Sequence, residues 1–189
     1  MSVLVIDNLS PFTGDILQCL DTIGVNHSCL KYFEVPSNFA DKQCLTPSKI
    51  ILSGRQKNSR ETNAVNSKIV KYCYETAKSV LGICYGAEII ALTFGGSIKK
   101  IKEGHVQGLT TVRVSTMSPL LSKKVELKVY ESHRYCVANL PDNFDSIASS
   151  QSCEHEIFSH RQKKIFGTQF HPEKSGSDGL DLLSRFVNL

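Results

Sequence analysis

The sequence predicts an α/β fold, with a mainly parallel central sheet that helices flank and that antiparallel strands extend. Three observations support this prediction. The 189 residues are enough for one domain with one sizeable core, so we treat residues 1–189 as a single domain. In the first half, short apolar runs alternate with amphipathic segments, which is typical of parallel strands joined by helices. In the second half, short strand candidates follow one another with turn residues between them, which indicates antiparallel pairing.

The chain opens with a predicted parallel strand and a helix. Residues 3–6 are a short apolar run with β-branched character, followed by two polar residues, as expected for a buried strand of such a sheet. Apolar residues then recur at helical spacing from Thr13 to a stop at Gly24, which predicts the first helix. A second strand is expected at residues 29–32, and the following stretch to Pro47 stays unassigned.

The centre of the chain continues the alternation. Residues 50–52 form an apolar run, and the polar segment 53–63 after it predicts an exposed loop. An amphipathic helix should follow, because apolar residues recur every four positions. These residues are Val65, Ile69, Cys73 and Ala77. Residues 80–83 then predict a buried strand, and residues 87–94 predict a helix that ends at two glycines.

The second half contains several strand candidates and a last helix. The strand candidates are residues 109–114, 125–129, 147–148, 156–158 and 165–168. Residues 178–187 carry most of their apolar side chains on one side, which predicts an amphipathic helix at the end of the chain. Because helices and strands alternate early and strands dominate late, we expect a parallel sheet with an antiparallel extension.

Composition and charge argue against several classes of function. The hydrophobic content of 41% and the charged content of 21% are ordinary for a soluble protein, and no segment approaches the roughly 20 apolar residues of a membrane span. The net charge of +4 is mild and the basic residues are dispersed, so neither nucleic acid nor a membrane is an expected partner. The seven cysteines are scattered and lack a CxxC pair, and no signal-peptide pattern opens the chain. We therefore expect reduced thiols, no metal site and a cytoplasmic location.

Residues 82–86 read Gly-Ile-Cys-Tyr-Gly, which has the spacing of a nucleophile elbow with a thiol in place of the usual hydroxyl. A nucleophile held between a strand and a helix has a strained backbone, so the residues two positions away on either side must be small. The helix after Cys84 points its amino end at the sulfur, which favours the thiolate. The alternative interpretation is a buried cysteine in a tight turn.

A thiolate nucleophile needs a histidine that takes and returns its proton, and a carboxylate usually orients this histidine. His171, Pro172 and Glu173 follow the strand candidate 165–168, so His171 should stand at the same edge of the sheet as Cys84. Alone, such a tripeptide is more often a turn than a site, but its coincidence with the elbow favours a site. We expect Cys84, His171 and Glu173 to be the catalytic residues.

These two motifs together resemble the paired signature of the class I glutamine amidotransferases. The second motif reads Gly-Thr-Gln-Phe-His-Pro-Glu at residues 167–173, and the resemblance covers nearly the whole chain. It implies the flavodoxin-like architecture of that family and a glutaminase activity without a cofactor. It also implies that Cys84 attacks the side-chain amide of glutamine. His171 would protonate the departing ammonia and then activate water, and Glu173 would hold His171.

The same resemblance assigns the groups that bind the oxyanion and the substrate. It places the oxyanion at the backbone N–H of Tyr85 and at a loop amide of Gly54 or Arg55. Many relatives have two glycines and a proline in that loop, so Arg55 departs from the family pattern. The glutamine that usually follows the elbow is here Glu88, which either alters glutamine binding or is an exposed helix charge.

Within this family, the second half resembles the free-standing glutaminase subunit of archaeal-type GMP synthetase. The residues that carry this resemblance are Glu131, Ser132, His133, the run 141–144, the run 148–150, Cys153 and Glu156. The resemblance implies that the partner is an ATP-pyrophosphatase subunit. ATP and Mg²⁺ would bind only there, because the chain has no GxxxxGK phosphate loop. His133, which we expect at the partner interface, is either simply a surface or interface histidine or has a role in signalling to the synthase. Tyr135 replaces the aspartate usual in that subfamily.

Other functions stay open. Residues 7–13 resemble the opening of the anthranilate and aminodeoxychorismate synthase glutaminases, although their Tyr-His-Ser motif is missing, and residues 171–176 resemble the imidazole glycerol phosphate synthase glutaminase. The triad also fits a peptidase that cleaves γ-glutamyl bonds. A regulatory subunit that binds glutamine or a synthase without turnover would explain the departures at Arg55, Glu88 and Tyr135, but the intact triad argues against it.

Overall fold

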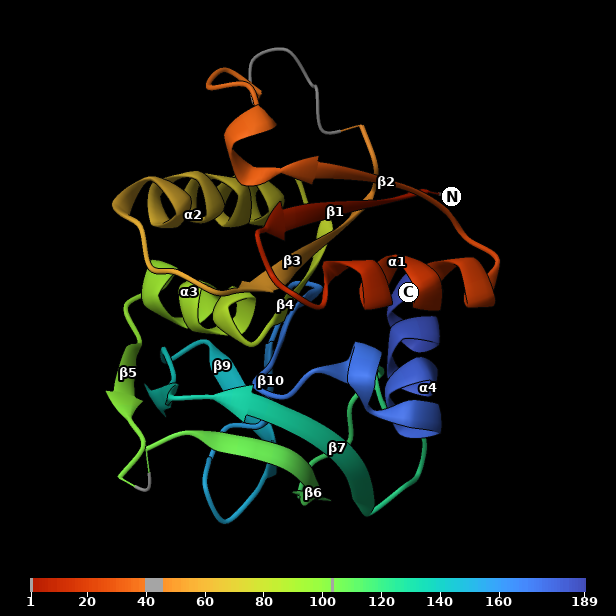
Figure 1. Cartoon of the computed structure of the whole chain (residues 1–189), viewed down its shortest axis with the longest axis vertical. Coiled ribbons are helices and arrows are strands. Elements are labelled where there is room, and N and C mark those ends of the chain that lie inside the picture. The colour runs from red at the N-terminus through yellow and green to blue at the C-terminus, as the bar shows by residue number, and fades with distance from the viewer. Residues whose placement is uncertain (1, 40–45, 103) are drawn as a thin grey trace.

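The computed structural model describes residues 2–39, 46–102 and 104–189, and most of its strands form one nine-stranded sheet (Figure 1). From one edge to the other, the strands of this sheet are β2 (Asn26–Lys31), β1 (Ser2–Asn8), β3 (Lys49–Arg55), β4 (Ser79–Ile83), β11 (Ile165–Thr168), β10 (Ile157–His160), β9 (Phe144–Ser149), β6 (Val106–Val114) and β7 (Glu126–His133). Strands β5 (Ser97–Lys100) and β8 (Tyr135–Asn139) pair with each other in a separate antiparallel ribbon.

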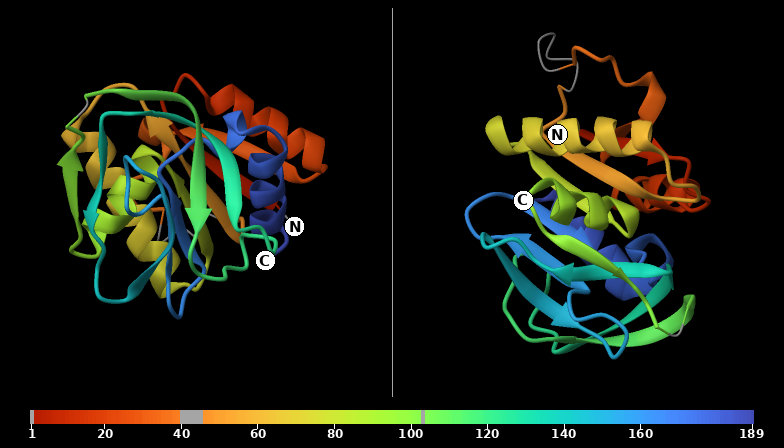
Figure 2. Two further views of the ribbon diagram at one scale, coloured as in Figure 1. Left: turned by 90° about the horizontal axis from the view of Figure 1, so that it is seen from below. Right: turned by 90° about the vertical axis from the view of Figure 1, so that its left-hand side faces the viewer.

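The sheet changes from parallel to antiparallel at β11. The strands from β2 to β11 pair in parallel, and the pairs from β11 to β7 are antiparallel. The right-hand view of Figure 2 shows the antiparallel strands, coloured green to blue, at the opposite end of the molecule from β1 and β2. The predicted parallel sheet with an antiparallel extension is therefore confirmed.

Helices cover both faces of the parallel part. Helices α2 (Arg60–Glu75) and α3 (Tyr85–Thr93) lie on one face, and α1 (Thr13–Ile23) and α4 (Gly176–Val187) lie on the other (Figure 1). Two short 3₁₀ turns, η1 (Tyr32–Glu34) and η2 (Pro172–Lys174), also belong to the described residues. Turn η2 leads from the sheet into α4 and carries part of the site described below.

Side-chain alternation along the buried strands explains these layers. In β1, Val3 and Val5 belong to the core under α1 and α4, whereas Leu4 and Ile6 belong to the core under α2 and α3. All four side chains are buried. Successive side chains of a strand point to opposite faces, so a continuous apolar run fills both cores. The parallel strands therefore appear in the sequence as apolar runs without alternation.

The structure corrects several local predictions. Strand β3 continues through Arg55, where the sequence predicted a loop. Helix α2 begins within that expected loop, because the Ser59 hydroxyl accepts a 3.0 Å hydrogen bond from the Thr62 N–H and caps the helix. Ala77 lies beyond the end of α2 with a positive φ of 56°. Strands β5 and β8 were not predicted from the sequence.

No helix among the described residues is long and apolar enough to cross a membrane. The cysteines in the described residues are free thiols, and most of them are buried, as predicted. Cys44 lies outside the described residues, as does part of the stretch before Pro47 that the sequence left unassigned.

Candidate active site

Cys84 lies at the turn between β4 and α3, in a backbone conformation that a residue with a side chain rarely adopts. Its φ is 52° and its ψ is −105°. The glycines on either side leave the space that this turn needs. A Cβ on Gly82 would lie 2.2 Å from the Gly86 carbonyl oxygen, and a Cβ on Gly86 would lie 2.3 Å from the Leu52 carbonyl oxygen. The geometry is that of the strained strand-to-helix turn which the sequence predicted.

His171 and Glu173 lie beside this turn because β11 pairs in parallel with β4. The Cys84 N–H donates a 2.7 Å hydrogen bond to the carbonyl of Thr168, the last residue of β11, so the two strands end side by side. The His171 ring faces Glu173, with 2.7 Å between Nδ1 and Oε1. The ring of Phe12 packs edge-on against the imidazole, with 4.8 Å between the ring centroids. These contacts fix the orientation of His171 and leave Nε2 as its free ring nitrogen.

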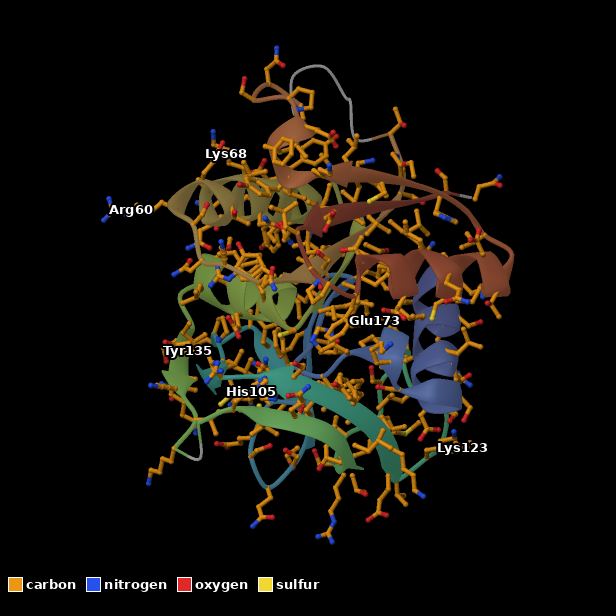
Figure 3. The ribbon with its side chains drawn as sticks, in the orientation of Figure 1. Arg60, Lys68, His105, Lys123, Tyr135 and Glu173 are labelled. Atoms are coloured by element: carbon orange, nitrogen blue, oxygen red, sulfur yellow. The ribbon has the colours of Figure 1, made fainter. Side chains whose placement is uncertain are left out.

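Gly54 brings the end of β3 close to Cys84 and His171. A Cβ at Gly54 would lie 3.1 Å from His171 Cε1 and 3.8 Å from Cys84 Cβ. Cys84 and His171 both line a pocket of about 510 Å³, a size that suits a small-molecule ligand. In Figure 3, Glu173 lies near the middle of the molecule. His105 and Tyr135, which line the pocket, lie to the left of Glu173 in this view.

Burial raises the pKa of the Cys84 thiol well above its ordinary value, and the nearby Glu88 carboxylate raises it further. The N–H of Tyr85, at the start of α3, lowers this pKa by hydrogen bonding to the sulfur, but burial outweighs it. The start of the helix therefore acts in the expected direction, but the thiol of the free protein keeps a raised pKa because burial has the larger effect. A nucleophilic thiolate would need a base to remove this proton, and the His171 imidazole lies beside the Cys84 turn.

Glu88 lines the same pocket and is only 6% exposed, so the interpretation as an exposed helix charge is wrong. Burial raises its pKa to about 7, while the Arg55 guanidinium and a hydrogen bond from Gln169 act in the opposite direction. The Gln169 side-chain amide also lies 3.9 Å from Cys84 Sγ. Gln169 was not predicted as a site residue from the sequence, although it lies within the motif that ends at Glu173.

The Arg55 side chain is held in place by Tyr85 and Asn63. Its guanidinium carbon lies 3.8 Å from the centroid of the Tyr85 ring, which is a cation–π contact. Arg55 Nη1 and the Tyr85 hydroxyl both donate to Asn63 Oδ1, over 2.7 Å and 3.0 Å. Asn63 was expected in an exposed loop, but it lies in the first turns of α2 and joins these two residues.

His133 is a buried residue with a side chain that is 1% exposed, so the expectation of a surface histidine is wrong. It lines the pocket from the antiparallel half, and its role toward a partner stays a prediction. Two carboxyl groups, those of Glu131 and Glu156, lie next to it. Burial raises the pKa of Glu156 well above its ordinary value, and the Glu131 carboxylate adds to the effect. The sequence named these residues only as marks of a resemblance and did not place them together.

The parallel sheet has helices on both faces, and the Cys84 turn lies beside His171 and Glu173. A comparison with known families identifies the class of enzyme that has these features. The family model described as glutamine amidotransferase class-I matches residues 4–188. The chain belongs to this family, and it is a glutamine amidotransferase.

Individual relatives show which members of the family this chain resembles. The A subunit of the glutamine-hydrolyzing GMP synthase of Thermoplasma acidophilum is 31% identical over 100% of this chain and 92% of its own length. A solved structure from the same organism, described as a putative A subunit of GMP synthase, has a TM-score of 0.86 at 30% identity, and covers 100% of this chain and 92% of its own. A glutamine amidotransferase from Thermotoga maritima, at 20% identity, shares the fold with a TM-score of 0.75, covering 100% of this chain and 81% of its own.

Longer relatives contain this chain as one part. The glutamine-hydrolyzing GMP synthase of Ruthia magnifica is 34% identical over 98% of this chain. The matched region is 36% of that relative, so the chain spans about a third of its length.

Proposed function

We propose that the chain hydrolyses the side-chain amide of glutamine through a thioester at Cys84 and delivers the ammonia to a synthase that makes GMP from xanthosine monophosphate. The observation that carries this proposal is the placement of Cys84 at a strained turn beside the His171–Glu173 pair, with 2.7 Å between Nδ1 and Oε1. The printed names of the relatives, GMP synthase and its A subunit, support the choice of synthase.

The chemistry follows from these three residues. Nε2 of His171 takes the Cys84 proton while Glu173 stabilises the imidazolium, and the sulfur attacks the amide carbon of glutamine. The tetrahedral intermediate collapses when His171 gives its proton to the amide nitrogen, the C–N bond breaks and ammonia leaves. Water then attacks the thioester and loses a proton to His171. The C–S bond breaks, Cys84 regains its proton, and glutamate is released.

Backbone and charged groups around Cys84 would bind the oxyanion and the substrate. The Tyr85 N–H already faces the sulfur, and we assign the second oxyanion donor to an amide of Gly54 or Arg55, since Gly54 lies beside both Cys84 and His171. Glutamine carries an ammonium and a carboxylate on its α-carbon. Glu88 and Arg55 line the pocket with the opposite charges, so we assign them to these two groups.

A partner is part of the proposal, because the longer relatives are about three times the length of this chain. We assign that role to an ATP-pyrophosphatase subunit, which would activate xanthosine monophosphate with ATP and Mg²⁺, and no cofactor is assigned to this chain. His133, at the end of β7, lines the pocket from the antiparallel half, and we assign to it the role of passing a signal from the partner. We place both proteins in the cytoplasm.

The test is ammonia release from glutamine by the purified chain, alone and with the pyrophosphatase subunit, ATP and xanthosine monophosphate. Cys84→Ala should lower the rate at least about 1000-fold, because the covalent route is lost. Cys29→Ala is the matched control, since Cys29 is exposed on the edge strand β2 and should leave the rate unchanged. Ammonia that rises with the partner supports both the chemistry and the synthase.

Other outcomes would select the rival functions. Cys84-dependent turnover that ignores the partner keeps the glutaminase and points to another synthase, such as anthranilate or aminodeoxychorismate synthase. Faster cleavage of γ-glutamyl peptides than of glutamine indicates a peptidase. No ammonia under any condition, with Cys84 unlabelled by a thiol-trapping glutamine analogue, would favour the regulatory subunit.

A further inference from the structure

Three buried side chains behind the catalytic pocket form a cluster that the proposed glutaminase reaction does not use. Glu131 and His133 lie two positions apart on β7, so they point to the same face of the sheet, and Glu156 directly precedes β10. Glu131 and Glu156 are 0% exposed and His133 is 4% exposed. One carboxylate or imidazole atom from each residue lies within 4.8 Å of the other two.

Each of the three side chains has one polar atom held by the surrounding protein. The Ser150 hydroxyl donates to Glu156 Oε1 over 2.7 Å, and the Ser152 hydroxyl donates to Glu131 Oε2 over 3.3 Å. His133 Nδ1 lies 2.9 Å from the Tyr135 carbonyl oxygen, so this nitrogen carries a proton and donates it. The neutral form of His133 then has a lone pair on Nε2.

The other polar atom of each side chain has no hydrogen-bond partner outside the cluster among the residues that the structure describes. These atoms are Glu131 Oε1, Glu156 Oε2 and His133 Nε2. Leaving a buried polar atom unpaired is costly, and three such atoms at one place are unusual. His133 Nε2 also lies 3.5 Å from Glu131 Oε2, so a lone pair and a carboxylate face each other unless a positive charge lies near them.

We propose that Glu131, His133 and Glu156 bind one divalent transition-metal ion, for which Zn²⁺ is the test ion. Two carboxylates and one imidazole are a donor set that Zn²⁺ accepts, and the ion would cancel the charge of both carboxylates. The outer hydrogen bonds from Ser150, Ser152 and the Tyr135 carbonyl correspond to those that orient ligands in metal sites. Binding requires the three donor atoms to move toward one another, because zinc sites hold their ligands at about 2.0–2.2 Å from the ion.

The ion would strengthen the wall of the catalytic pocket without taking part in a reaction step. Ser132 lies between Glu131 and His133, and its carbonyl oxygen is 3.9 Å from Cys84 Sγ. The Glu156 carbonyl accepts a 2.8 Å hydrogen bond from the Gln169 N–H, within the motif that leads to His171. A metal at this place would therefore join β7 to the segment before β10 directly behind the nucleophile.

The experiment uses the full chain, stripped with EDTA, dialysed and then titrated with Zn²⁺. We expect about one tightly bound Zn²⁺ per chain by calorimetry and elemental analysis, and a thermal midpoint about 5 °C higher or more with saturating Zn²⁺. Glu156→Gln and Glu131→Gln should each weaken Zn²⁺ binding at least tenfold and remove most of the thermal shift. Glu154→Gln is the matched control, because Glu154 is exposed two residues before Glu156 and should bind Zn²⁺ like the parent.

Spectroscopy of the Co²⁺ form excludes capture of the ion by thiols. Cys136 and Cys153 are buried together nearby, and ligation by either one or by Cys84 would give a sulfur-to-cobalt charge-transfer absorption. We expect visible cobalt bands without that absorption. Circular dichroism identifies a variant that fails to fold, and the second glutamine variant then decides the result.

Three outcomes would overturn the proposal. One is the absence of stoichiometric metal in the parent chain, which would mean that Glu131 and Glu156 share a proton instead of a metal ion. The second is unchanged Zn²⁺ affinity in a folded Glu156→Gln or Glu131→Gln variant. The third is a thiolate signal in the cobalt spectrum.

Discussion

Glu88 is an ionisable side chain placed where its charge opposes the first step of the proposed reaction. It is buried in the pocket that contains Cys84, and its carboxylate is one cause of the raised pKa of the thiol. Because burial raises the pKa of Glu88 itself to about 7, the residue changes its charge near neutral pH. The pocket therefore contains an acid that is coupled both to stability and to the nucleophile.

Stability should depend on the ionisation of Glu88. Its pKa is about 7 in the folded chain and has the ordinary value of 4.5 when unfolded, so the folded state binds more protons between these values. The free energy of unfolding should then fall as the pH rises from about 4.5 to about 7, by at most on the order of 3 kcal/mol. Glu88→Gln removes the titrating group, so denaturant unfolding at pH 5 and pH 8 should show a smaller loss in the variant than in the parent.

The control for this prediction is Glu75→Gln, because Glu75 is exposed at the end of α2. Its unfolding free energy should follow the parent at both pH values. A Glu88→Gln variant that loses as much stability as the parent between pH 5 and pH 8 would show that Glu88 is ionised in the folded chain at both values.

The sequence was sufficient to predict that Cys84, His171 and Glu173 lie together, and insufficient to predict their surroundings. Cys84 and Glu173 belong to short motifs whose spacing is set by a turn, so the sequence contains the geometry. The contacts of Glu156 depend on the pairing of distant strands, and no local spacing records them. Burial of a polar residue cannot be predicted from the local sequence either. For this reason an exposed position was one of the alternatives for both Glu88 and His133, and the structure shows that both are buried.

Among the strands, those buried on both faces were predicted from the sequence, and those with little burial were missed. The strands of the parallel part are apolar because both of their faces are buried, so residues 50–52 and 80–83 are evident in the sequence. Strand β5 reads Ser-Ile-Lys-Lys and pairs only with β8 in a ribbon outside the main sheet. It lacks a hydrophobic pattern because only a small part of it is covered.

The turn between β4 and α3 gives the prediction at this scale. Gly86 lies in the first turn of α3, where helix propensity alone would favour alanine, but a Cβ there would lie 2.3 Å from the Leu52 carbonyl oxygen. Gly86→Ala should therefore lower the free energy of unfolding by about 3 kcal/mol, as overpacking of a rigid backbone does.

Gly14→Ala is the matched helix variant, because a Cβ at Gly14 meets open space. Thermal and denaturant unfolding should show Gly14→Ala unchanged or up to about 1 kcal/mol more stable. Equal effects of the two substitutions would mean that the turn adjusts to the methyl group.

The whole molecule assembles its pocket from both halves of the sheet. Residues 10–12 follow β1, Gln56 and Asn58 follow β3, and Cys84 and His171 follow β4 and β11. Parallel strands present their carboxyl ends at one edge, so these loops meet there. The antiparallel half adds residues 132–135, where β7 passes into β8. A partner that receives ammonia must cover this combined opening, since ammonia released elsewhere would escape into water.

The surface that the partner covers can therefore be predicted. Hydrogen–deuterium exchange of this chain with the pyrophosphatase subunit, ATP and xanthosine monophosphate should show slower exchange at residues 10–12, Gln56, Asn58 and residues 132–135, all of which line the pocket. Strand β2 lies at the far edge of the sheet and should exchange at the rate of the free chain. The chain with both nucleotides but without the partner is the control, and its exchange should match that of the free chain, because the nucleotides would bind only to the partner. Protection concentrated on β2 and α1, with the pocket loops unchanged, would place the synthase on the opposite side and leave the ammonia without a covered route.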